Sequence, residues 1–107
     1  MDFAQYQALA ARTAGMSQAN GRLAVAALGL TGEAGEVAEL VKKHLGHGHQ
    51  LEQGKVVNEL GDVLWYVAEV CNALGISLND VAQVNVAKLE RRYPAGFDPE
   101  RSRNRSE

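Results

Sequence analysis

The segment that most constrains the fold is VVNELGDVLWYVAEVCNAL, residues 56–74. Drawn as a helix it is apolar on nearly every side, and helices of that kind are surrounded by other elements. A chain of 107 residues can bury only a limited share of its surface by itself. We therefore predict that the bundle around this helix is completed by homo-oligomerisation, in a dimer or a tetramer.

Helical periodicity extends over most of the remaining chain. We predict helices at residues 2–13, 20–45, 52–74 and 77–92, which gives two long central helices with a flanking helix on either side. Gly75 is placed to cap the third helix, Ser77 to cap the fourth, and Pro94 to end it. The predicted fold class is all-α, a four-helix-type module in one domain over residues 1–95. Residues 96–107 have no periodicity, and we expect an extended or disordered tail there.

Three glycines recur at three-residue spacing inside the second predicted helix, at positions 29, 32 and 35. Glycine lowers helix propensity, so its repeated use inside a helix needs a reason. We interpret the spacing as the mark of another backbone that lies close to this helix.

Composition excludes several classes of protein. The net charge is −2, whereas nucleic-acid-binding domains usually present a strongly basic face. No apolar run reaches the roughly 18 residues of a membrane span, and the N-terminal residues lack the basic-then-apolar layout of a signal peptide. Cys71 is the single cysteine, so no disulfide can form within the chain. We expect a cytoplasmic protein without nucleic-acid or membrane partners.

Two pairs of acids fall on helix faces that should point inward. At 100° per residue, Glu33 shares a face with apolar residues of the second helix, and Glu36 lies beside it one turn on. On the third helix Glu59 shares its face with valines and a tyrosine, and Asp62 lies beside it. The pattern is Glu-x-x-Glu, then 22 residues, then Glu-x-x-Asp.

Four carboxylates brought together need compensation. Moving one isolated carboxylate out of water costs several kcal/mol or more unless it is paired, protonated or bound to a metal. A divalent cation compensates all four at once, and hard oxygen ligands suit Mg²⁺ or Mn²⁺ rather than Zn²⁺. Because Mg²⁺ commonly shares its coordination sphere with phosphates, the predicted substrate carries phosphate groups.

The fourth helix carries the complementary charge. Asn85, Lys88 and Arg92 lie along one polar stripe of this helix. A lysine and an arginine aimed at the metal site would bind phosphate oxygens. We expect a water activated by the metal to attack phosphorus, with a nearby carboxylate accepting its proton. The spacing does not say which carboxylate that is.

Each of these features also has a simpler interpretation. The acid pairs could lie on a solvated helix face, and Lys88 and Arg92 could stabilise a helix end through its dipole. The three histidines within residues 44–49 could form a metal cluster, but we interpret them as exposed loop residues. Cys71 is predicted to be a core residue. Trp65 is interpreted as a packing residue, although it could line a base pocket or a subunit interface.

Taken together, the motifs resemble the MazG-like, all-α nucleoside triphosphate pyrophosphohydrolases, from about residue 6 to residue 97. The segments that carry the resemblance are YQALAART (6–13), ALGLTGEAGEVAELVKK (27–43), ELGDVLWYVAEVCNALGIS (59–77) and NVAKLERRYPAGF (85–97). The resemblance implies that Mg²⁺ is ligated by four acids: Glu33, Glu36, Glu59 and Asp62. It associates the basic residues of the last segment, Lys88 and Arg92, with the phosphates.

The resemblance also implies a reaction. It is the hydrolysis of a nucleoside triphosphate between the α and β phosphates, which releases a monophosphate and pyrophosphate and serves to remove unwanted nucleotides. This chain is a single short module, whereas the family's namesake has two tandem copies. The motifs do not fix the residues that read the base; Gln7, Thr13 and Asn20, on or after the first helix, are the candidates.

A hypothesis of another class is a non-catalytic helical module that binds nucleotides or a partner protein without turnover. It predicts that substitution of the acids is tolerated. A carboxylate-bridged di-iron bundle usually needs Glu-x-x-His pairs, and no histidine follows either acid pair at that spacing.

Overall fold

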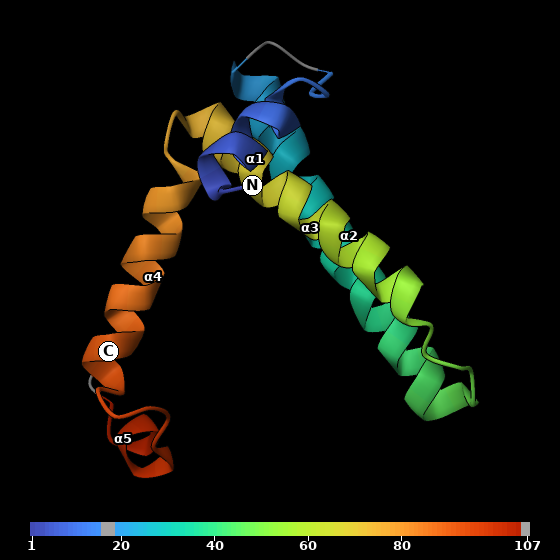
Figure 1. Cartoon of the computed structure of the whole chain (residues 1–107). Coiled ribbons are helices and arrows are strands. Elements are labelled where there is room, and N and C mark those ends of the chain that lie inside the picture. The colour runs from blue at the N-terminus through green and yellow to red at the C-terminus, as the bar shows by residue number, and fades with distance from the viewer. Residues whose placement is uncertain (16–18, 106–107) are drawn as a thin grey trace.

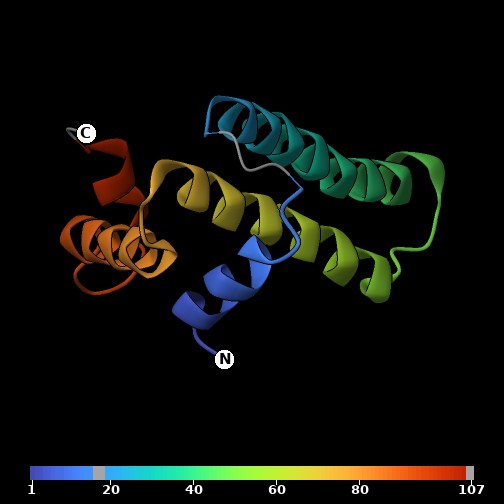
Figure 2. The same ribbon diagram turned by 90° about the horizontal axis from the view of Figure 1, so that it is seen from above.

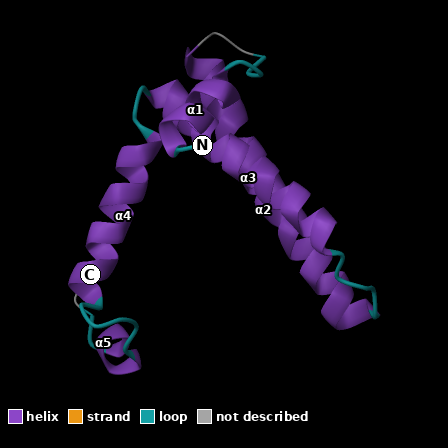
Figure 3. Ribbon diagram, viewed as in Figure 1, coloured by secondary structure: helices purple, strands orange, loops and turns teal. Residues whose placement is uncertain are grey.

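The computed structural model describes residues 1–15 and 19–105, and every element in these ranges is a helix (Figure 3). The elements are α1 (Phe3–Ala11), α2 (Ala19–His47), α3 (Gln53–Leu74), α4 (Leu78–Arg92) and α5 (Pro99–Arg103). The predicted all-α class is confirmed. Among the described helices, none combines the length and the apolar character that a membrane crossing requires.

The helices form two arms that meet at an angle (Figure 1). Helices α2 and α3 pack along each other and form the hairpin arm, while α4 leaves in another direction and forms the C-terminal arm with α5 (Figures 1 and 2). Helix α1 lies at the junction, against α3 and the start of α4. The radius of gyration is 16.9 Å, compared with about 13 Å for a compact domain of this length. The single chain is therefore open.

The change of direction between α3 and α4 follows from the residues of the connecting turn. Gly75 adopts a left-handed conformation with φ of 68°, which caps α3 at little steric cost. Ser77 then accepts a hydrogen bond from the backbone N–H of Asp80 at 3.2 Å and begins α4. Both caps are as the sequence predicts.

A small core holds the junction together. Its buried members are Ala10, Ala68, Cys71 and Leu78. Tyr6, Trp65 and Val67 pack against this cluster as half-buried side chains. Cys71 is 3% exposed and burial raises the pKa of its thiol, so its predicted role as a core residue is confirmed.

Two predictions about helix ends need correction. The tail was expected to be extended or disordered, but residues 99–103 form α5. Asp98 accepts a hydrogen bond from Glu100 N–H at 2.9 Å, and Pro99 occupies the first turn, where its missing N–H costs nothing. Helix α2 continues two residues beyond its predicted end, to His47, and Gly48 with φ of 73° follows. Residues 106–107 lie outside the described part of the chain.

The three glycines of α2 were predicted to mark the close approach of another backbone, but in one chain the structure shows a close side chain at Gly29 instead. A Cβ on Gly29 would collide with the ring of Tyr66 from α3, so this glycine admits an aromatic side chain rather than a backbone. At Gly32 and Gly35 a Cβ would meet no described side chain or neighbouring element within 4 Å. Of these three glycines, Gly29 alone is required by the packing of α2 against the described residues of α3.

Helix α3 is not surrounded on all sides within one chain. Ala68, Glu69 and Cys71 are its buried residues, because α1 and α2 cover one side. On the other side Val57 is 63% exposed and Leu60 is 51% exposed. The single chain therefore leaves much of the apolar segment 56–74 open to solvent.

Candidate metal centre

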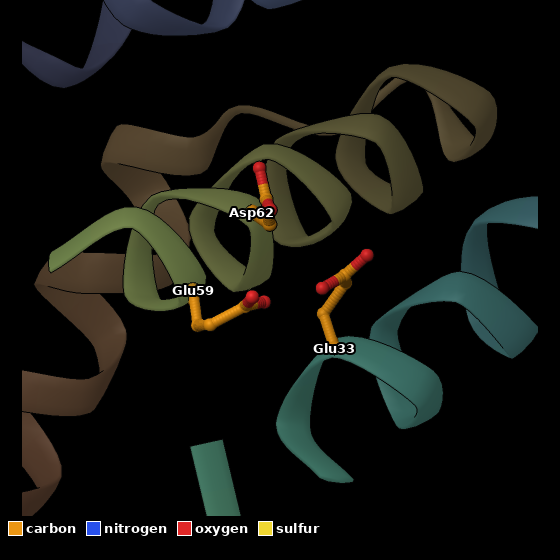
Figure 4. A group of neighbouring side chains, drawn as sticks. All are labelled: Glu33, Glu59 and Asp62. Atoms are coloured by element: carbon orange, nitrogen blue, oxygen red, sulfur yellow. The ribbon is translucent and has the colours of Figure 1, made fainter. Parts of the chain in front are cut away.

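Three carboxylates meet across the hairpin arm. Glu33 reaches from α2, and Glu59 and Asp62 reach from α3 (Figure 4). One oxygen of each side chain lies within 4.8 Å of an oxygen of the other two, and all three residues are half-buried. The three-residue spacing of Glu59 and Asp62 places both on the face of α3 that looks toward α2. The structure thus brings acids together that are 26 or more residues apart in sequence.

The acids repel one another in the absence of a cation. The pKa of Glu33 is raised, first by a side-chain hydrogen bond with Glu59, then by desolvation, and then by the negative charges of Asp62, Glu59 and Glu36. A raised carboxylate pKa means that the protonated form is favoured at this position. A cation among these oxygens would reverse that preference, because it favours the charged form.

Glu36 occupies a different position from the other three acids. It is exposed and does not belong to the group whose oxygens approach within 4.8 Å. Its charge nevertheless contributes to the raised pKa of Glu33, one helical turn away. Its role as a fourth ligand stays a prediction.

The donor set is chemically uniform. Across residues 1–15 and 19–105, the three acids are the group of His, Cys, Asp and Glu side chains that approach closely enough to hold an ion. The three histidines are exposed as predicted, but His44 and His47 belong to the last turn of α2, and only His49 lies in the loop. Nδ1 of His44 is 2.8 Å from the carbonyl oxygen of His49. A site built from carboxylate oxygens alone fits Mg²⁺ or Mn²⁺.

The predicted phosphate-binding residues lie on the other arm. Asn85 and Lys88 line an open hollow on α4 together with Ile76, Val81 and Val84. The distal half of α4, where these polar residues lie, runs away from the hairpin arm (Figures 1 and 2). One chain therefore does not bring them to the acids.

Arg92 lies still further along α4, at its last residue, and lines a second hollow that α4 forms with α5. Arg101 of α5 donates a hydrogen bond from Nε to the carbonyl oxygen of Arg92 at 2.8 Å. The binding of phosphate by Asn85, Lys88 and Arg92 stays a prediction, and it requires an approach that one chain does not provide.

Of the predicted base-reading residues, Gln7 uses both of its amide N–H groups in hydrogen bonds within the chain. Its Nε2 donates to Asn72 Oδ1 at 3.0 Å and to the carbonyl oxygen of Ile76 at 2.8 Å. Its Oε1 accepts from the N–H of Leu78 at 2.9 Å. The side chain ties α1 to the turn between α3 and α4, and its role in reading a base stays a prediction.

Thr13, the second predicted base-reading residue, also makes hydrogen bonds within the chain. Thr13 Oγ1 accepts a hydrogen bond from the indole N–H of Trp65 at 2.8 Å and donates to the carbonyl oxygen of Ala10 at 3.0 Å. It therefore positions the tryptophan ring. Asn20 belongs to α2, but its side chain lies outside the described part of the structure.

The sequence reasoning missed a buried ion pair further along the hairpin arm. Glu69 is 4% exposed and accepts two hydrogen bonds from Arg22, from Nε at 2.9 Å and from Nη2 at 2.5 Å. The spacing held a signal: Glu69 lies seven residues after Asp62, two turns on the same face, and Arg22 lies three turns before Glu33. Opposite charges in line with the acids of two packed helices predict such a pair.

The hydroxyl of Tyr6, on α1, is close enough to the acid group to be affected by its charge. The pKa of its hydroxyl is raised, first by desolvation and then by the negative charge of Asp62. Its aromatic ring also packs against the junction core. The junction and the acid group are thus neighbours along α3.

The fold and the site together define a class of protein: an all-α helical hairpin with a cluster of carboxylates between its two helices. Residues 23–97 match the family described as the MazG nucleotide pyrophosphohydrolase domain, and the chain belongs to this family. The chain is also 44% identical over 78 residues to "Gene 37 protein" of Mycobacterium phage L5, which covers 69% of this chain and 68% of the phage protein. No solved structure gives a significant match. Enzymes of the MazG family are metal-dependent, and the group of Glu33, Glu59 and Asp62 is suited to hold an ion.

Proposed function

We propose that this protein is a Mg²⁺-dependent nucleotide pyrophosphohydrolase, with Mn²⁺ as an alternative ion. It would cleave a nucleoside triphosphate between the α and β phosphates, release a monophosphate and pyrophosphate, and remove unwanted nucleotides from the cytoplasmic pool. The observation that carries the proposal is the meeting of Glu33, Glu59 and Asp62 across α2 and α3, in a chain of the MazG family.

The residues of the chain have separate tasks in this proposal. Glu33, Glu59 and Asp62 would hold the ion, and Glu36 would support them from one turn away. The ion itself would supply Lewis acidity and lower the pKa of a bound water. Lys88 and Arg92 would bind phosphate oxygens through charge-assisted hydrogen bonds, and Asn85 would assist them.

The proposal includes a homo-oligomer, because the cations and the acids lie on different arms of one chain. The accessible surface of the chain is 7676 Å², whereas a compact monomer of its mass exposes about 5,800 Å². The excess of about 1,900 Å² per chain is of the size that obligate subunit interfaces bury. Large apolar side chains are exposed on both arms, such as Leu28 of α2 at 74% and Val84 of α4 at 68%.

In the simplest arrangement, the C-terminal arm of one chain covers the hairpin arm of a second chain. This would bury the open side of α3 and bring Asn85, Lys88 and Arg92 of that neighbouring copy near the acids. Size-exclusion chromatography with light scattering should then give a mass of at least two chains. A mass of one chain at micromolar concentration would contradict the oligomer.

The test of the activity is direct. The purified protein is incubated with a panel of canonical and modified nucleoside triphosphates and Mg²⁺, and the products are separated by chromatography. Equal release of monophosphate and pyrophosphate, abolished by EDTA, is the expected result. No turnover with Mg²⁺ or Mn²⁺, combined with measurable nucleotide binding, would favour the non-catalytic binding module instead.

A further inference from the structure

A small hollow lies in the hairpin arm, beyond the acids and toward the junction. It is lined by Trp65 and Tyr66 of α3 and by Val25 and Ala26 of α2, and it has a volume of about 210 Å³. The ion pair of Arg22 and Glu69 lines it as well. We call it the Trp65 hollow. Pockets that take drug-sized ligands measure about 300–1,000 Å³, so this hollow suits a single ring system rather than a whole nucleotide.

The aromatic wall of the hollow is held in place from several directions. The indole N–H of Trp65 donates to Thr13 Oγ1 at 2.8 Å, and the rings of Trp65 and Tyr66 meet edge to face, with centroids 4.9 Å apart and planes at 87°. The Tyr66 ring lies over Gly29, where a side chain would displace it. A wall fixed in this way is a ready platform for another flat ring, since little side-chain entropy is lost when the ring binds.

The polar wall of the hollow has N–H donors from which no described residue accepts a hydrogen bond. Arg22 carries five N–H groups, of which two are directed to the buried carboxylate of Glu69. The side chain of Arg22 is 21% exposed, while that of Glu69 is 6% exposed. Glu69 therefore orients the guanidinium, and the remaining N–H groups of Arg22 are available to carbonyl oxygens and ring nitrogens of a ligand.

The hollow and the acids lie in one line along the hairpin arm. Tyr66 and Glu69 follow Asp62 by four and seven residues on the same face of α3, and Ala26 precedes Glu33 by seven residues on α2. At 1.5 Å per residue these separations are about 6–10 Å. A sugar would bridge that length between a ring in the hollow and a phosphate at the acids.

We propose that the Trp65 hollow is the base-binding subsite of this protein. The inference rests on the proposed function, since it assigns the nucleobase of the same substrate. The base would pack against Trp65 and Tyr66, and Arg22 would donate to its edge. Arginine pairs best with an edge that presents a carbonyl oxygen beside a ring acceptor, as guanine does. Carbonyl-bearing bases should therefore bind more tightly than adenine.

The single tryptophan makes binding visible without catalysis. Fluorescence of Trp65 is titrated in EDTA with guanosine, uridine and adenosine monophosphates, and with ribose 5-phosphate as the base-free probe. We expect saturable quenching by the nucleotides, strongest for the carbonyl-bearing bases, and none by ribose 5-phosphate. Equal quenching by ribose 5-phosphate would overturn the assignment.

Two variants of lining residues sharpen the test. Val25→Phe fills the hollow and should weaken nucleotide binding and raise KM by about 10- to 100-fold, the range of a lost base–aromatic contact, with kcat unchanged. Arg22→Lys keeps a positive charge beside Glu69 but loses the planar fork, and it should remove the preference over adenine. Val41→Phe, at a 38% exposed position of α2 outside the hollow, is the matched control. Thermal melts establish that each variant is folded.

The outcomes separate this inference from the proposed function. Saturable quenching without hydrolysis of any triphosphate would sink the proposed function and leave the base site standing. Hydrolysis by folded Val25→Phe with unchanged KM and unchanged quenching would sink the base site alone.

Discussion

The two arms of the molecule differ in how far their helices are packed within a single chain. In the hairpin arm, α2 and α3 pack along each other, and their acids meet within 4.8 Å, where the negative charges of Asp62, Glu59 and Glu36 act on Glu33. In the C-terminal arm, α4 carries Lys88 and Arg92, and among the described residues it packs against α1 and α3 near its start and meets α5 at its end. The negative and positive halves of the proposed site are thus built separately, and each presents charge that the other would neutralise.

Helix packing and the proposed site therefore need not be completed within the same chain. The hairpin arm has its own contacts but unfavourable electrostatics, since the pKa of Glu33 is raised by its neighbours. The C-terminal arm has apolar side chains without cover, such as Val84 and Val86, which are 68% and 52% exposed.

The acids of the hairpin arm should carry the largest effect. Glu59→Gln is expected to lower pyrophosphate release by about 1,000-fold, because the ion it would hold supplies several kcal/mol of transition-state stabilisation. The control is Glu39→Gln, the same change at an acid of α2 that pairs with Lys42 at 3.1 Å. Retention of a tenth or more of the activity in Glu59→Gln would remove this residue from the site.

Lys88 tests whether the arms cooperate between chains. Lys88→Ala should lower kcat/KM by about 10- to 100-fold, the cost of one hydrogen bond to a charged group. Co-expression of Lys88→Ala with Glu59→Gln should then restore about a quarter of the wild-type activity in a two-fold symmetric dimer, where mixed pairs hold one intact site. If co-expression restores nothing while mixed pairs are shown to form, the two arms do not share a site across chains.

Gly29 tests the packing of the hairpin arm alone. Gly29→Ala should lower the free energy of unfolding by about 1–3 kcal/mol, because the added methyl group overpacks against the ring of Tyr66. Gly35→Ala, where a Cβ meets no described neighbour, should instead be neutral or stabilise by up to about 1 kcal/mol. Urea denaturation of both variants measures these changes in the free energy of unfolding. Equal changes would show that the contact of Gly29 with Tyr66 does not require a glycine.

Glu36 should matter less than Glu59. Glu36→Gln is expected to reduce activity by about 10-fold, the lower end for groups that support a metal site from outside its first ligands. The reason is its exposed position outside the close group of acids. Calorimetric titration with Mg²⁺ measures the same difference in affinity. A loss equal to that of Glu59→Gln would make Glu36 a direct ligand.

The smallest effect is the pH dependence of stability in EDTA. The pKa of Glu33 is raised above its ordinary value of 4.5, so the folded state binds more protons than the unfolded state in this window. Stability should therefore fall as pH rises from about 4.5 through the raised pKa. Glu33→Gln should flatten this slope, whereas Glu90→Gln, at an exposed position of α4, should leave it unchanged. Mg²⁺ at neutral pH should restore stability to the wild type and to Glu90→Gln, but not to Glu33→Gln, which lacks one of the acids of the group.

Local patterns in the sequence are sufficient to predict the helices and the helix face on which each residue lies. Helix hydrogen bonds join residues four apart, so caps such as Gly75 and Ser77 are recognisable locally. The same period puts Glu59 and Asp62 on one face before any partner is known. The short helix α5 was missed, although Asp98 and Pro99 are a start signal, because five residues show no periodicity.

Which helix faces meet depends on contacts between residues that are far apart in the sequence. That Glu33 joins Glu59 and Asp62 while Glu36 stays exposed depends on the rotation of α2 against α3, which many weak side-chain contacts set together. The pairing of Arg22 with Glu69, the contact of Gly29 with Tyr66 and the use of Gln7 as a clamp have the same origin. The divergence of α4 likewise follows from a few contacts at the junction between residues about 70 positions apart, which no local pattern encodes.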